Sequence, residues 1–81
     1  MYRLYDVYDG EDFLGIAADY ADAYNIFYQR IEDTDGECDF DFEPSNGEVD
    51  DELQTKILEA MDTAMSDYLD NNYEDEDEDY F

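Results

Sequence analysis

Glu37-Cys38-Asp39-Phe40-Asp41-Phe42-Glu43 is the stretch that decides the fold, because its acidic and apolar residues alternate without exception. A period of two is typical of a half-buried β-strand, whose successive side chains point to opposite faces. Cys38, Phe40 and Phe42 are therefore expected to face a core. The four acidic residues would form a ladder on the other face, with neighbours about 6.6–6.8 Å apart by rise alone. Pro44 ends this predicted strand.

A helix is predicted before the strand. Asp19 is a suitable N-cap residue, and apolar residues then recur at helical spacing as far as Ile31. The core face of this helix consists of Tyr20, Ala23, Tyr24, Phe27, Tyr28 and Ile31. Ile26 falls outside this stripe and is interpreted as an isolated surface residue. Residues 32–36 are rich in turn formers and are expected to link the helix to the strand.

A second helix is predicted after the strand, from about Asp50 to Asn72. Its core stripe consists of Leu53, Ile57, Ala60, Met61, Ala64 and Tyr68. Leu58, Met65 and Leu69 lie beside this stripe and widen it to about half of the helix circumference. A stripe of this width indicates either deep burial or a second packing partner, which could be another copy of the chain in a homodimer.

The chain before the first helix is predicted to form a β-hairpin. Residues 2–8 and 13–18 have strand-like compositions, and Asp9-Gly10 between them favours a tight two-residue turn. Gly15 is interpreted as a bulge or a point of close approach. The expected fold is therefore α+β, in the order β-hairpin, helix, third antiparallel strand, helix (ββαβα). Residues 1–72 would form this single domain, and residues 73–81 an acidic flexible C-terminal tail.

The predicted tail contains the densest charge in the chain, with six consecutive acidic residues from Glu74 to Asp79. Such a run repels itself and lacks the apolar surface that would offset the loss of chain entropy, so it should stay solvated. In total, 27 acidic residues face only Arg3, Arg30 and Lys56, and the net charge is −24. This charge argues against direct binding to nucleic acid or to anionic membranes, and it favours complexes with basic surfaces.

Most catalytic classes lack the residues that they need. There is no histidine, so histidine bases, His-ligated metals and Ser-His-Asp triads are excluded. Cys38 lies on the predicted inward face and is more typical of a core residue than of a nucleophile. Asp33-Thr34-Asp35-Gly36 is similar to part of an EF-hand, but its register places Ile31 and Phe42 at positions that require oxygen ligands. We therefore expect no enzyme activity, no cofactor and no specific metal site.

The cellular compartment is indicated by features that the sequence lacks. One cysteine cannot form an intrachain disulfide, which is typical of a reducing compartment. The first residues contain no basic segment followed by an apolar one, and no apolar run is long enough to span a bilayer. We therefore expect a cytoplasmic protein.

The remaining candidate for a functional feature is the acidic surface, which recurs on several of the predicted elements. On a strand or a helix, such carboxylates lie about 5–7 Å apart and could engage the arginines and lysines that normally bind phosphates. Tyrosines interleaved with acids could add the aromatic contacts that are enriched at interfaces. The candidate partner-binding residues are Asp33, Asp35, Glu37, Asp39, Asp41, Glu43, Glu52, Glu59, Asp62, Asp70, Glu74, Asp75, Glu76, Asp77, Glu78 and Asp79.

In its size, acidity and lack of catalytic residues, the chain resembles the DNA-mimic proteins of phages and mobile elements. These include anti-CRISPR proteins, antirestriction proteins and inhibitors of uracil-DNA glycosylase. The resemblance covers the whole chain but is one of composition, so no functional residue is carried over. It implies inhibition of a basic nucleic-acid-binding protein in an infected bacterial host. A CRISPR effector complex is the first candidate partner, and a restriction enzyme is the second.

Two other interpretations remain open. An acidic chaperone or adaptor would shield a basic protein without blocking an enzyme. A halophilic structural domain would also be strongly acidic, although such domains usually keep more than the three basic residues found here. Competition with DNA distinguishes a DNA mimic from a chaperone, and a need for molar salt to fold would indicate a halophilic domain.

Overall fold

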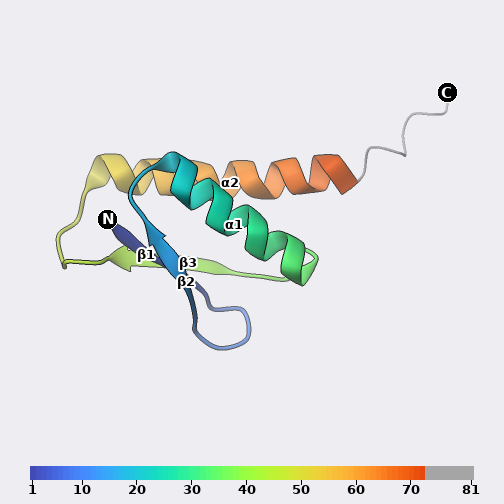
Figure 1. Ribbon diagram of the computed structural model, residues 1–81, viewed down its shortest axis with the longest axis horizontal. Helices are drawn as coiled ribbons and strands as arrows, with labels where there is room; N and C mark the ends of the chain where they lie inside the picture. Colours follow the sequence, from blue (N-terminus) through green and yellow to red (C-terminus); the bar gives the residue numbers. More distant parts are fainter. Residues whose placement is uncertain (73–81) are drawn as a thin grey trace, which may run out of the picture.

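The computed structural model describes residues 1–72 and has the predicted α+β fold (Figure 1). Its elements are β1 (Tyr2–Asp6), β2 (Asp12–Ala17), α1 (Tyr20–Thr34), β3 (Phe40–Pro44) and α2 (Asp51–Asn72). The sheet is antiparallel, with the order β2-β1-β3, and both helices lie over the same face of it (Figure 1). The predicted tail, residues 73–81, lies outside the described residues. No helix within residues 1–72 is both long and apolar enough to cross a membrane.

The core lies between the helices and the inward face of the sheet. β1 contributes Tyr2 and Leu4, which point inward at alternate positions. The helices contribute Ala23, Phe27, Ile31, Leu53, Ile57, Ala60, Ala64 and Tyr68. All of these belong to the two predicted stripes, so the helical periodicity identified both core faces correctly. Phe27 packs on Phe40 with ring centroids 4.5 Å apart, and this contact joins α1 to β3.

The connection between β1 and β2 is longer than the predicted two-residue turn. It comprises residues 7–11, and of these only Gly10 has a positive φ. The chain turns at residues 8–10, and the side chain of Asp6 supports this turn by accepting a hydrogen bond from the backbone nitrogen of Tyr8 at 3.0 Å. The tight two-residue form of the Asp9-Gly10 turn is therefore wrong, although both residues lie in the turn and the hairpin itself is present.

Gly15 lies at a β-bulge and at a close approach, as the sequence indicated. The register of β2 against β1 shifts beside Gly15, where Leu14 is the extra residue. A Cβ atom on Gly15 would lie 3.1 Å from Cδ1 of Ile26, so glycine allows α1 to approach the sheet closely. Ile26 therefore packs between α1 and β2, and its interpretation as an isolated surface residue is wrong.

The chain between α1 and β3 also differs from the prediction. α1 continues past Ile31 to Thr34, so most of the predicted link is helical. The helix ends at Asp35, which adopts a left-handed conformation with φ 59, and the backbone nitrogen of Gly36 donates to the carbonyl of Ile31 at 2.9 Å. These contacts satisfy carbonyls at the helix end that would otherwise lack partners.

β3 is shorter at its start than the predicted strand 37–43. Pairing begins at Phe40 because β1 ends opposite it, at Asp6. At the other end, the strand ends at Pro44 as predicted, and Pro44 is its last paired residue, opposite Tyr2. The alternation itself is confirmed, since the apolar residues of 37–43 are half-buried and the acidic ones are all exposed.

Candidate functional site

The charge on the surface of residues 1–72 is overwhelmingly negative. Every acidic side chain in this range is exposed except Asp6, which is buried, and Asp67, which is half-buried. The basic residues compensate little of this charge. Arg3 and Arg30 each bind acidic residues of the chain itself, and Lys56 makes no salt bridge within residues 1–72. The exposed carboxylates therefore form the candidate functional surface.

Asp6 has a structural role that separates it from this surface. Its Oδ2 accepts a hydrogen bond from Nε of Arg30 at 2.7 Å, and its Oδ1 accepts from the backbone nitrogens of Tyr8 and Asp39 at 3.0 and 3.2 Å. Burial alone would raise the pKa of Asp6, but these hydrogen bonds and the charge of Arg30 outweigh burial and lower it. Arg30 also binds the exposed Asp12 at 2.9 Å. The buried carboxylate thus joins β1, α1 and the segment that enters β3.

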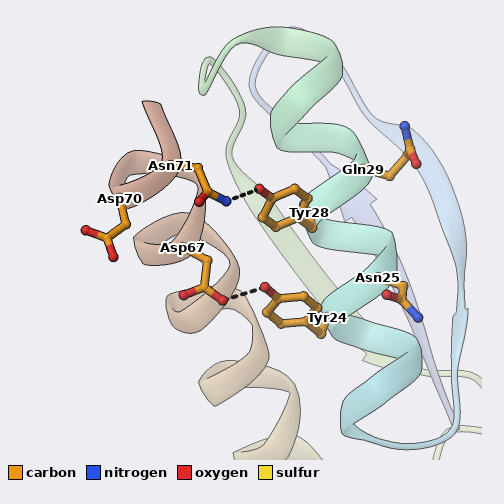
Figure 2. Close-up of a pocket in the computed structure, with 7 residues that line it drawn as sticks. All are labelled: Tyr24, Asn25, Tyr28, Gln29, Asp67, Asp70 and Asn71. Atoms are coloured by element: carbon orange, nitrogen blue, oxygen red, sulfur yellow. Dashed lines mark hydrogen bonds between the residues drawn. The ribbon is translucent and has the colours of Figure 1, made fainter. Parts of the chain in front are cut away.

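Tyrosine hydroxyls bind carboxylates where the two helices meet. Tyr24 donates to Oδ2 of Asp67 at 2.5 Å (Figure 2), and Tyr68 donates to Oδ1 of Asp35 at 2.7 Å. The first bond raises the pKa of Tyr24 to about 12, because ionisation would break it and bring two negative charges together. The pKa of Tyr68 is raised for the same reason. The two helices are therefore joined by hydrogen bonds from neutral hydroxyl groups. These bonds do not neutralise the carboxylates that accept them.

A groove of about 590 Å³ lies between α1 and α2 beside Tyr24 and Tyr28 (Figure 2). Its polar groups are mostly paired within the chain, since Tyr28 accepts a hydrogen bond from Nδ2 of Asn71 at 2.9 Å and Tyr24 binds Asp67. Asp70 lies at the rim, and its carboxylate points away from the tyrosines (Figure 2). The groove therefore adds one exposed carboxylate to the acidic surface.

Three of the four residues of the predicted acidic ladder lie on β3 or at the residue before it, but one end of this row is partly neutralised. Asp39, Asp41 and Glu43 are all exposed. Glu43 accepts a hydrogen bond from the hydroxyl of Tyr5 at 2.9 Å, and it lies 3.5 Å from Nη1 of Arg3. Asp41 accepts a hydrogen bond from the next backbone nitrogen at 2.8 Å. Asp39 and Asp41 therefore remain as fixed carboxylates with no basic residue bound to their side chains within residues 1–72.

The candidate residues near the end of α1 have mixed roles. Asp35 is the helix C-cap and accepts the hydrogen bond from Tyr68, so it contributes to the fold. Asp33 and Glu37 are exposed and line shallow hollows that Arg30 also lines. The structure therefore does not place these three residues in one continuous row with the ladder of β3.

The candidate residues of α2 are all exposed and share its outer face, because Glu52, Glu59 and Asp70 are separated by nearly whole helical turns and Asp62 lies beside them. Glu52 lies near Lys56 at the start of the helix, Asp70 lies by the groove against α1, and Asp62 lies on the side that faces β3. Glu59 is exposed on the remaining outer surface. The six predicted tail residues, 74–79, lie outside the described residues.

The structure brings Asp39 and Asp62 together at a groove of about 260 Å³ between α2 and β3. The apolar residues that line it are Cys38, Phe40, Leu58, Met61 and Met65. Burial raises the pKa of the Cys38 thiol, which disfavours the reactive thiolate, so this residue has the character of a packing residue. This groove was not predicted from the sequence, although the unusual width of the apolar stripe on α2 was a signal of it.

No protein family, curated protein or solved structure matches this chain. Within residues 1–72, no group of three or more potential ligand side chains is placed to hold a metal ion. The function is therefore inferred from the chemistry of the surface.

This surface can bind cations in a defined way. Exposed carboxylates on β3 and α2 are held by regular secondary structure and can accept charge-assisted hydrogen bonds from arginine or lysine. The groove between these elements adds apolar surface next to Asp39 and Asp62. A basic protein surface with an apolar residue among its cations has the complementary chemistry.

Proposed function

We propose that the protein inhibits a nucleic-acid-binding protein by occupying its nucleic-acid groove with carboxylates in place of phosphates. The observation that carries this proposal is the separation of charge within residues 1–72. All but two acidic side chains are exposed, while two of the three basic residues bind the chain's own acids. Self-repulsion of this size weakens a compact state, and a basic partner would relieve it.

The positions of the carboxylates support this mechanism. Asp39, Asp41 and Asp62 are held by β3, the segment that enters it and α2, so they lose little chain entropy when a partner binds. Duplex DNA carries one negative charge per about 1.7 Å of helix axis over both strands. A single row of carboxylates about 5–7 Å apart is sparser than this, so acids on several elements are needed to approach the charge density of DNA.

The first candidate partner is a CRISPR effector complex in the cytoplasm of an infected bacterial host. Such an effector reads a short DNA motif with arginines and holds nucleic acid in a positively charged channel. Both features are cationic surfaces that fixed carboxylates could occupy. A restriction enzyme, which also binds duplex DNA, is the next candidate.

One observation favours a second function. The exposed acids point in several directions, and a protein that shields a basic partner on many sides would need such a distribution. An acidic chaperone or adaptor is therefore the alternative. It would bind the basic protein without excluding DNA from a catalytic groove.

Affinity capture from the host cell tests the proposal. The immobilised protein should retain nucleic-acid-binding proteins, identified by mass spectrometry, and an excess of duplex DNA should prevent their capture. A double variant with Asp39→Lys and Asp41→Lys, confirmed to be folded, is the control and should retain much less. Capture that is unaffected by DNA would contradict the DNA-mimic mechanism and support the chaperone.

A further inference from the structure

The groove between α2 and β3 exists because α2 packs mainly against α1. The two helices share the most extensive contact between elements of the described chain, and Ala60 and Ala64 are fully buried in the core. The opposite flank of α2 carries Leu58, Met61 and Met65, which line the groove toward Phe40 of β3. Leu58 is 48% exposed, so this flank is only partly covered.

The chemistry of the groove combines apolar surface with negative charge at its edge. Methionine side chains are flexible and polarisable, so Met61 and Met65 can adapt to a bound apolar group. Asp62 of α2 and Asp39, the residue before β3, are both exposed and both line the groove. A partner side chain that enters the groove between them would contact apolar surface. The residues next to it in the partner's sequence would lie close to the two carboxylates.

We propose that this groove binds an apolar side chain flanked by arginine or lysine, carried by a segment of the basic partner. This inference rests on the proposed function and adds a source of specificity to it. Charge alone would allow the protein to bind any basic surface. Burial of one apolar side chain in the groove would favour partners that place such a residue among their cations, and this contribution would persist in high salt.

Charge complementarity selects this occupant over a second copy of the chain. Each copy carries a net charge of −24, so an interface at this acidic edge would bring like charges together. A cationic segment would instead be attracted to Asp39 and Asp62. The other exposed leucine of α2, Leu69, is 41% exposed and does not line the groove, so it offers a matched control.

The free edge of β3 is poorly suited to pairing with a partner strand. Asp39 and Ser45 direct their backbone groups to β1, so the even-numbered residues between them face the free edge. Pro44 has no backbone N–H to donate, and the N–H of Phe42 is bound by Asp41. The occupant is therefore expected to bind through side chains, without adding a strand.

Binding of two synthetic peptides tests the inference. They have equal length and charge, and one alternates arginine with glycine whereas the other alternates arginine with leucine. Fluorescence anisotropy with the full chain should show about tenfold tighter binding of the arginine–leucine peptide, and the ratio should persist in high salt. Leu58→Asn should abolish this difference, and Leu69→Asn should leave it unchanged. Equal affinity for both peptides, or equal effects of both variants, would overturn the inference.

Two controls keep the outcomes separate. Circular dichroism verifies folding, and Met65→Gln, which should also abolish the difference, replaces Leu58→Asn if that variant does not fold. Sedimentation should show the free protein as a monomer, and a dimer that depends on Leu58 would overturn the inference in favour of a second copy. If the two peptides bind equally well but the protein still displaces DNA from its partner, only the proposed binding of an apolar side chain in the groove would be rejected. Selective peptide binding without DNA displacement would reject only the proposed inhibitory function.

Discussion

Nε of Arg30 lies 2.7 Å from Oδ2 of Asp6, and this contact ties α1 to the central strand of the sheet. The chain has three basic residues and uses one of them to compensate its buried acid. Of the exposed acids in residues 1–72, Asp12 and Glu43 form salt bridges with Arg30 and Arg3, and the others form none. Charge that holds the fold together is therefore distinct from charge that is available to a partner, and the two can be altered separately.

Arg30→Gln should destabilise the fold by about 3 kcal/mol, because it leaves the buried carboxylate of Asp6 without its charged partner. Arg3→Gln is the matched control, since its ion pair with Glu43 is exposed and such pairs contribute about 0–1 kcal/mol. Urea unfolding followed by circular dichroism measures both changes. Equal, small losses in the two variants would contradict the structural role of Arg30.

The hydrogen bond to Asp67 predicts a loss of stability at alkaline pH. It raises the pKa of Tyr24 from its ordinary value of 10.0 to about 12, so folding favours the protonated hydroxyl. Its contribution is fully present below pH 10.0 and is lost as the pH rises through about 12. Thermal melting should show a steeper loss in this window for the native chain than for Tyr24→Phe. Parallel alkaline profiles would contradict this role of the hydroxyl.

Removing residues 73–81 should leave the fold intact, because the core described above is built from residues between Tyr2 and Tyr68. The truncation also removes six like charges, so the melting temperature should stay the same or rise. Circular dichroism and thermal melting of residues 1–72 measure both effects. A large loss of helical signal would show that Tyr80 or Phe81 belongs to the core.

Reversing the charge of Asp39 and Asp41 to lysine should weaken partner binding by about a hundredfold or more, because positioned carboxylates contribute more than solvated ones. Replacing the six acids of residues 74–79 by amides should mainly slow association and reduce its salt dependence. A matched control reverses the exposed Asp9 and Glu11 in the loop between β1 and β2. Calorimetry at two salt concentrations measures each affinity.

The opposite pattern has a specific meaning. If the variant with Asp39 and Asp41 changed to lysine binds the partner normally, and the variant with amides at residues 74–79 does not bind it, residues 74–79 alone would carry the function. The chaperone interpretation would then replace the DNA mimic. If the control variant with Asp9 and Glu11 reversed loses as much affinity as the variant with Asp39 and Asp41 reversed, only the total charge of the protein would matter for binding.

The order of the elements could be predicted from the sequence because the helices and the third strand have strong periods and the hairpin strands have strand-like compositions. The helical stripes of α1 and α2 and the alternation in residues 37–43 identified which residues face the core. The sequence also indicated the bulge at Gly15. Local patterns of this kind depend on neighbouring residues and do not require knowledge of the packing.

Contacts between distant residues could not be predicted in this way. Tyr2, Leu4 and Asp6 share one phase of β1, so a buried acid could have been recognised, but its partner on α1 could not. The bond between Tyr24 and Asp67 depends on how the two helices cross. The groove beside Asp39 depends on the space left between α2 and β3, which the width of an apolar stripe does not specify.

Displacement of DNA from the captured partner tests the central claim most directly. A fluorescent duplex is first bound to the purified partner, and the protein is then added while anisotropy is followed at physiological salt. We predict that the duplex is released in proportion to the added protein, and that the protein alone does not shift the duplex in a gel. A complex that contains DNA, partner and this protein together, or direct binding of the protein to the duplex, would contradict the account.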